Sequence, residues 1–132
     1  MIRKVLHSKI HQAVVTETRP EYSGSLTIDI EIMRLCGMRA NDVVLVANCK
    51  TGARFETYLF EGEPNSGIIG VNGAAAHLAS VGDKIIILHW AHISEQEYQS
   101  HFPKILIMNK DNSVRESRCY LPSDCDTELV DC

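Results

Sequence analysis

The chain has no long apolar run, no excess of basic residues and no stretch rich in Gly, Pro or Ser. A membrane-spanning helix needs roughly 20 apolar residues, and residues 1–12 carry Lys, Arg and His where a signal peptide would be apolar. A formal net charge of −4 disfavours a general nucleic-acid binder, because neutralising phosphates requires a surplus of Lys and Arg. We therefore expect a cytoplasmic protein with neither a membrane nor a nucleic acid as partner.

Cysteine occurs five times, an odd number that disfavours a disulfide framework in a chain with no export signal. Reduced thiols are expected. Cys119, Cys125 and Cys132 crowd the C-terminus, but their spacings lack the C-x-x-C pairing typical of zinc and redox sites. The length of 132 residues fits one domain whose core is large enough to need no disulfide or metal for folding.

Short segments of alternating apolar residues, separated by turn residues, dominate the sequence. A period of two is typical of half-buried strands, and no full crossover helices separate these segments. A mainly β fold, such as a barrel, is predicted, with hairpin tips at Lys50-Thr51-Gly52 and Lys110-Asp111-Asn112. The predicted strands are Ile2–Leu6, Ala13–Thr18, Leu26–Ile28, Val43–Asn48, Phe55–Phe60, Ile68–Val71, Lys84–Ala91 and Lys104–Asn109.

Three short helices are predicted from local capping residues. Asp29 can cap a helix that ends at Cys36, with Gly37 as the left-handed stop. The alanines of Ala74–Ala79 favour a second helix, and Ser94-Glu95-Gln96-Glu97 has the S-x-x-E pattern of a capping box. The third helix must end near His101, because Pro103 disfavours helical geometry in the residue before it.

The segment Glu21-Tyr22-Ser23-Gly24-Ser25, taken alone, indicates only a β-turn between two strands. It is followed in order by Gly52-x-Arg54-Phe55-x-Thr57-Tyr58, by Val71-Asn72-Gly73-Ala74-Ala75-Ala76-His77 and by Ser80-Val81-Gly82-Asp83. In their order and spacing these motifs resemble those of the aspartate 1-decarboxylase family, and the N-G-A-A-A-H stretch is the most specific of them. The resemblance runs from Met1-Ile2-Arg3 to about Asn109.

Members of that family fold as six-stranded double-psi β-barrels with short helices. They assemble as homotetramers with active sites between subunits, and some need a helper protein to mature. The resemblance implies that residues 1–114 form such a barrel and that the chain cuts itself between Gly24 and Ser25, into a chain of residues 1–24 and a chain from residue 25. Residues 115–132 are polar and acidic, and a flexible C-terminal tail is expected there.

The implied reaction converts L-aspartate to β-alanine and CO2, which supplies β-alanine for pantothenate, the precursor of coenzyme A. Loss of CO2 from an α-amino acid leaves a carbanion that no ordinary side chain delocalises, so an electron-accepting carbonyl is required. The sequence has no convincing pyridoxal-phosphate domain. The resemblance implies instead a covalent pyruvoyl group, made from Ser25, that takes the substrate amine as a Schiff base.

The resemblance also assigns roles to single residues. In self-processing the Ser25 hydroxyl attacks the Gly24 carbonyl, which lacks a neighbouring Cβ, and Thr57 and Asn72 help through hydrogen bonds. Tyr58 is the implied proton donor in the decarboxylation. Arg54 and Lys9 are the implied cationic clamp for the carboxylate that the substrate retains. The remaining substrate-binding residues are Thr57, Tyr22, Gly73, Ala74 and Ala75.

The histidines do not form a metal site in this interpretation. His89 and His92 lie three residues apart in a predicted strand, so their side chains point to opposite faces. His7 and His11 are about 13 Å apart in an extended strand, too far to share one ion. No metal is predicted.

Two alternatives stay open at this point. The chain could keep the barrel as a non-catalytic binding or assembly module that is never cut. It could also be a pyruvoyl-dependent decarboxylase of another acidic amino acid, because a cationic clamp alone does not exclude glutamate.

Overall fold

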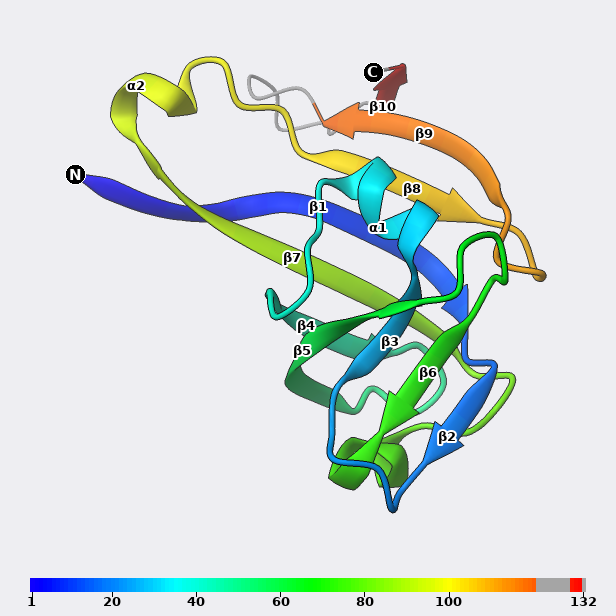
Figure 1. Cartoon of the computed structure of the whole chain (residues 1–132). Coiled ribbons are helices and arrows are strands. Elements are labelled where there is room, and N and C mark those ends of the chain that lie inside the picture. Colours follow the sequence, from blue (N-terminus) through cyan, green and yellow to red (C-terminus); the bar gives the residue numbers. More distant parts are fainter. Residues whose placement is uncertain (121–128, 132) are drawn as a thin grey trace.

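The computed structural model describes residues 1–120 and 129–131, and these residues form a mainly β domain (Figure 1). Two α-helices, one 3-10 helix and ten strands are present in these ranges. None of these helices has the length and apolar character needed to cross a bilayer. The strands are β1 (Ile2–Val14), β2 (Glu17–Arg19), β3 (Leu26–Asp29), β4 (Val43–Asn48), β5 (Arg54–Gly62), β6 (Ile69–Asn72), β7 (Lys84–Ser94), β8 (Lys104–Met108), β9 (Val114–Tyr120) and β10 (Leu129–Asp131), and the helices are α1 (Ile30–Cys36), η1 (Gly73–Leu78, 3-10) and α2 (Glu95–Tyr98).

The strands pair in the order β10-β9-β8-β1-β7-β4-β5-β3-β6-β2. Most neighbours are antiparallel, but β1–β8, β3–β5 and β2–β6 are parallel. Within this order the strands run from β1 through β7, β4, β5, β3 and β6 to β2. The last of them, β2, lies close to the end of β1, because only Val15 and Thr16 separate these two strands in the chain. Val15 N donates to Asp83 O at 2.9 Å and Thr16 N to Ile69 O at 2.8 Å, so this link bonds to both arms of the ladder. The mainly β, single-domain prediction is confirmed, and the arrangement agrees with a barrel; the psi crossings stay a prediction.

The core lies inside this curved sheet and consists of aliphatic side chains at alternate strand positions. Ile85 and Ile87 in β7, and Val44 and Val46 in β4, are fully buried. Alternation sends their neighbours to the opposite face, so one face of each strand fills the core. The further fully buried members include Ile10, Leu26, Ile28, Leu59, Ile69 and Leu106.

The helices form where the capping residues predict them. The Asp29 carboxylate accepts a hydrogen bond from Glu31 N at 2.9 Å, and Gly37 ends α1 with φ +68°. Ser94 and Glu97 form the reciprocal capping box of α2. The Ala-rich segment forms the 3-10 helix η1, which is wound more tightly than the expected α-helix.

Strand β1 is longer than the sequence pattern indicates. The prediction left residues 7–12 outside a strand, whereas β1 runs without a break from Ile2 to Val14. Its pairing with β7 shifts register between Leu6 and Ser8 and again between Ile10 and Ala13. These bulges reverse the inward and outward alternation, so a test for period two fails in that region.

The sequence predicts a loose tail from residue 115, whereas the structure has residues 114–120 in β9. This strand pairs with β8 across the predicted tip Lys110-Asp111-Asn112, and β10 returns beside it with Val130 opposite Cys119. The free edge of β8 supplies backbone partners to a polar segment that has no apolar pattern of its own. The other residues of the predicted tail, 121–128 and 132, lie outside the described ranges.

The cysteines differ from the expectation at one position. Cys36 and Cys49 are free thiols, as predicted. Cys119 is disulfide-bonded, so the expected reduced thiol is wrong there. Disulfide formation depends on which residues the fold brings together, and cysteine spacing alone does not report this.

Candidate active site

The predicted reactive bond lies in the turn between β2 and β3, and this turn has unusual backbone geometry. Gly24 has φ +93° and Ser25 has φ +101°. Gly24 N donates to Tyr22 O at 2.8 Å, which tightens the turn. Positive φ is costless for glycine but costs a residue with a Cβ about 1–3 kcal/mol, and such strain persists only where surrounding contacts enforce it. The strain therefore falls on the one serine assigned as nucleophile.

Asn72 enforces the conformation of Ser25. Ser25 is 2% exposed. Asn72 Nδ2 donates to Ser25 Oγ at 3.2 Å and to Thr27 Oγ1 at 3.0 Å, while Asn72 N donates to Ser25 O at 3.0 Å. Asn72 precedes η1 as its N-cap residue, but its side chain makes no capping hydrogen bond; its Nδ2 donates to the two hydroxyls instead. Its amide thus fixes the position of the Ser25 hydroxyl.

Gly73 brings the start of η1 against the Gly24 backbone. A Cβ on Gly73 would lie 2.7 Å from Gly24 Cα and 3.1 Å from Tyr22 O, closer than real side chains approach. Gly73 also has φ +69°, in the left-handed region. Both observations require glycine here. Ala74 and Ala75 follow in η1, with Ala74 exposed and Ala75 half-buried.

Tyr58 reaches the same turn from strand β5. Its neighbour Leu59 is the Cα partner of Leu26, the residue after Ser25. The Tyr58 hydroxyl donates a long hydrogen bond to Ser23 O at 3.4 Å, and a Cβ on Gly24 would lie 3.9 Å from that hydroxyl. Phe60 packs edge-to-face with both Tyr58 and Tyr22. The phenol of Tyr58 is therefore held beside the Gly24–Ser25 bond by an aromatic row.

Three predicted residues do not join this cluster. Thr57 is half-buried, shares the core-facing side of β5 with Leu59 by alternation, and makes no side-chain hydrogen bond to the turn within the described chain. Arg54 begins β5, is exposed and forms no ion pair among the described residues. Lys9 lies in β1, and no hydrogen bond or ion pair joins it to Ser25; its ammonium donates to the Tyr120 hydroxyl at 3.0 Å instead.

A cavity of about 450 Å³ lies on the Thr27 side of Asn72. Glu17, Glu61 and Glu63 line it, and Arg19, its cation, is already paired with Glu17 at 3.2 Å. Surplus carboxylates repel an anionic ligand, so this cavity is unsuited to a dicarboxylate. The exposed Arg54 is the better place for such a ligand.

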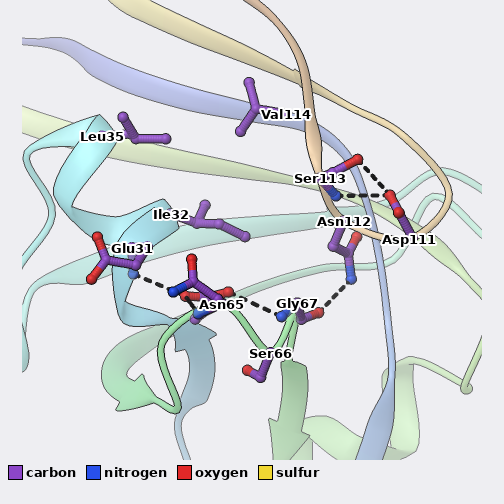
Figure 2. Close-up of a pocket in the computed structure, with 11 residues that line it drawn as sticks. Glu31, Ile32, Leu35, Asn65, Ser66, Gly67, Asp111, Asn112, Ser113 and Val114 are labelled. Atoms are coloured by element: carbon purple, nitrogen blue, oxygen red, sulfur yellow. Dashed lines mark hydrogen bonds between the residues drawn. The ribbon is translucent and has the colours of Figure 1, made fainter.

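A second cavity, of about 300 Å³, is lined by α1, the loop 65–67 and the β8–β9 tip (Figure 2). The buried Asp29 carboxylate accepts from Asn65 N at 3.1 Å and from Gly67 N at 3.0 Å, as well as capping α1. Figure 2 shows Asn112 reaching Gly67, whose carbonyl accepts from Asn112 Nδ2 at 2.8 Å. These polar groups fasten loops to one another, so we assign this cavity a structural role.

The structure also contains a histidine array that sequence reasoning missed. His89 Nε2 lies 3.0 Å from Asp42 Oδ2, and His89 Nδ1 lies 3.2 Å from His7 Nδ1. Burial lowers the pKa of His7, and the nearby His89 and His101 lower it further, against an opposing effect of Asp42. The array depends on the pairing of β1 with β7, so residues 82 positions apart meet without a local signal. In the part of the chain that the structure describes, no group of three or more His, Cys, Asp or Glu residues is arranged to hold a metal ion.

Fold and site together define a small β protein in which a strained, buried Gly-Ser bond is held by an asparagine and faced by a tyrosine. The model of the aspartate decarboxylase family matches residues 1–115 of this chain. Aspartate 1-decarboxylase from Staphylococcus aureus is 47% identical over 116 residues, which cover 88% of this chain and 91% of that protein. Aspartate 1-decarboxylase from Caldicellulosiruptor saccharolyticus is also 47% identical, over 86% of this chain and 89% of its own. The chain belongs to the aspartate decarboxylase family, as its motifs predict.

Proposed function

We propose that this protein is a self-processing decarboxylase that converts L-aspartate to β-alanine and CO2, and so supplies β-alanine for pantothenate synthesis. The observation that carries the proposal is the buried, positive-φ Ser25 whose hydroxyl oxygen accepts from Asn72 directly after Gly24. The matched family and its aspartate 1-decarboxylases support the substrate. The cytoplasmic location expected from the sequence stays a prediction.

In the first step Ser25 Oγ attacks the Gly24 carbonyl carbon. A bond forms between Oγ and that carbon, the Gly24–Ser25 C–N bond breaks, and the hydroxyl proton passes to the freed Ser25 nitrogen. Asn72 Nδ2, 3.2 Å from Oγ, orients the hydroxyl, and the absence of a Cβ on Gly24 leaves the carbonyl open. Elimination of the resulting ester gives a Gly24 carboxylate and a dehydroalanine, and hydrolysis of the latter releases ammonia and leaves a pyruvoyl group.

The residues around Ser25 fit such a group. Asn72 Nδ2 could donate to an oxygen there, and Gly73 leaves the space that the turn requires. The pyruvoyl carbonyl, once made, supplies the electron sink that the loss of CO2 needs. Tyr58 is the acid of this site, because its hydroxyl lies at the turn and a phenol delivers a proton without carrying a permanent charge. For Thr57 the role in self-processing and substrate binding rests on the family resemblance alone, because its hydroxyl makes no hydrogen bond to the turn in the uncut chain.

The substrate's second carboxylate needs the positive charge of Arg54 and Lys9. No polar contact unites Lys9 with the Ser25 turn in one chain, so we infer that the partner subunit's Lys9 completes each site in a homotetramer. Co-expression of Lys9→Gln with Ser25→Ala tests this inference. Mixed oligomers should contain some intact sites and recover activity that neither variant has alone; absence of recovery would show that Lys9 and Ser25 must lie in the same chain.

The proposal is tested by denaturing mass spectrometry of the purified protein after mild heating. Two fragments, residues 1–24 and 25–132, with a carbonyl-reactive terminus on the larger one, are expected, whereas Ser25→Ala should stay folded and uncut. Tyr58→Phe should be processed normally and turn over aspartate far more slowly. A single intact chain with no aspartate decarboxylation would favour the non-catalytic module, and faster turnover of glutamate would replace the substrate. Expression without other proteins from its source shows whether a helper is required.

A further inference from the structure

Lys9 is held by a residue from the far end of the chain. Its ammonium lies 3.0 Å from the Tyr120 hydroxyl and 5.5 Å from the centre of that ring, so it sits at the hydroxyl end rather than over the ring face. The contact is therefore a hydrogen bond that Lys9 donates. It joins residues 111 positions apart.

The sheet holds both residues in place. Strands β1 and β9 flank β8, and Ile105 of β8 is the Cα partner of Lys9 on one side and of Arg118 on the other. Tyr120 N donates to Pro103 O at 3.1 Å, which anchors the end of β9 beside the start of β8. Tyr120 lies beyond residues 1–115, the part of this chain that the family model matches.

The electrostatics around Lys9 suit an anion. Lys9 has no ion pair among the described residues. The pKa of His11 is lowered, first by burial and then by the positive charges of Lys9 and Arg115, so this part of the protein is cationic. A neutral phenol fixes the ammonium without cancelling its charge, as a carboxylate would. Among the described residues the ammonium makes this one hydrogen bond, so two of its three hydrogens have no partner there.

We propose that Tyr120 is a positioning residue that fixes the Lys9 ammonium to receive the carboxylate that the substrate retains. The proposal rests on the proposed function, in which Lys9 contributes to the cationic clamp. A lysine side chain has about 2 kcal/mol of rotamer entropy to lose when it is immobilised. The Tyr120 hydroxyl restricts that side chain before the substrate arrives, so less entropy is lost on binding.

The test compares Tyr120→Phe with Tyr98→Phe. Tyr98 is the matched control because it lies in α2, where its ring faces Arg3 and its hydroxyl makes no hydrogen bond among the described residues. For Tyr120→Phe we expect KM for aspartate to rise about fivefold, which corresponds to about 1 kcal/mol for one hydrogen bond. The kcat value, self-cleavage and thermal midpoint should match those of Tyr98→Phe.

Succinate provides a readout independent of turnover, because it has two carboxylates and no amine. Its dissociation constant, measured by titration calorimetry, should rise by the same factor in Tyr120→Phe. In a Lys9→Gln background, Tyr120→Phe should not raise the succinate dissociation constant further. Unchanged KM and succinate affinity, a fall in kcat alone, or an additive effect in that background would each overturn the positioning role.

The two proposals fail separately. If the wild-type protein does not decarboxylate aspartate, the proposed function fails. The positioning role of Tyr120 is then tested by the succinate dissociation constant alone. If wild-type turnover is normal and Tyr120→Phe is indistinguishable from Tyr98→Phe, only the positioning role fails. Wild-type protein that binds no succinate would also overturn it.

Discussion

Replacing Gly73 with alanine tests how the Gly24–Ser25 bond is held. The new Cβ would lie 2.7 Å from Gly24 Cα and 2.8 Å from Gly24 N. Both are backbone atoms, so no flexible side chain can move aside. Ordinary contact begins near 3.4 Å, and the two segments must separate by about 0.7 Å, from 2.7 to 3.4 Å.

Two costs add in this variant. Alanine at φ +69° costs about 1–2 kcal/mol, and overpacking against fixed atoms adds about 1–3 kcal/mol. Gly52→Ala is the matched control, because Gly52 has φ +76° and open space where a Cβ would be. The control carries only the first cost, so the difference in the free energy of unfolding isolates the contact with Gly24.

Stability is measured by urea unfolding in a Ser25→Ala background, at one protein concentration, so that processing does not intervene. Gly73→Ala should lose about 1–3 kcal/mol more than Gly52→Ala. In the Ser25 background its self-cleavage should slow at least about tenfold, because misplacement of reacting atoms by a fraction of an ångström is costly. If both variants lost the same stability and were cut at the wild-type rate, the close approach of Gly73 to Gly24 would have no role in holding the bond.

Three further predictions concern other parts of the fold. Burial raises the pKa of Cys36 to about 12, so at pH 8 iodoacetamide should label the exposed Cys49 and leave Cys36 unmodified until the protein unfolds, as peptide mass mapping would show. Burial and neighbouring histidines lower the pKa of His7 in the folded state, so the unfolded chain takes up the proton first as the pH falls. The stability that neutral His7 contributes is therefore fully present above about pH 6.5 and is lost as the pH falls through the lowered pKa. The thermal midpoint of His7→Gln should accordingly fall less between pH 7 and pH 5 than that of the wild type. Asp29→Ala removes the acceptor of three backbone hydrogen bonds and should cost about 3 kcal/mol or more in urea unfolding. Asp111→Ala should cost less, because its exposed carboxylate accepts from Ser113 alone.

Features encoded locally are predictable from the sequence. The start of α1 at Asp29, its stop at Gly37 and the capping box at Ser94 each depend on a few adjacent residues, and all three form as expected. Strand β9 is not predictable from local residues, because a polar segment such as residues 114–120 becomes a strand only when the edge of β8 is beside it. The bulges of β1 defeat a period-two pattern for a related reason, since they are set by the pairing with β7.

The candidate site divides in the same way. Motif resemblance identifies Gly24, Ser25, Tyr58 and Asn72, and the fold brings these four together. The contact of Lys9 with Tyr120 links the two ends of the chain, and no local pattern could report it. Family motifs could not report it either, because Tyr120 lies outside the matched region.

The strain at Ser25 gives the proposed cleavage a driving force that exists only before the bond breaks. The φ angle of Ser25 is defined by its bond to the Gly24 carbonyl carbon, so φ +101° ceases to exist once that bond is cut. The 1–3 kcal/mol stored in this angle would accelerate cleavage by about 5- to 150-fold if the transition state released all of it. Ser25→Gly would remove the strain but also the nucleophile, whereas Ser25→Thr keeps a hydroxyl and the strain together. Asn72 bonds both Oγ and O of Ser25, and thereby maintains the strained angle while it orients the attacking atom.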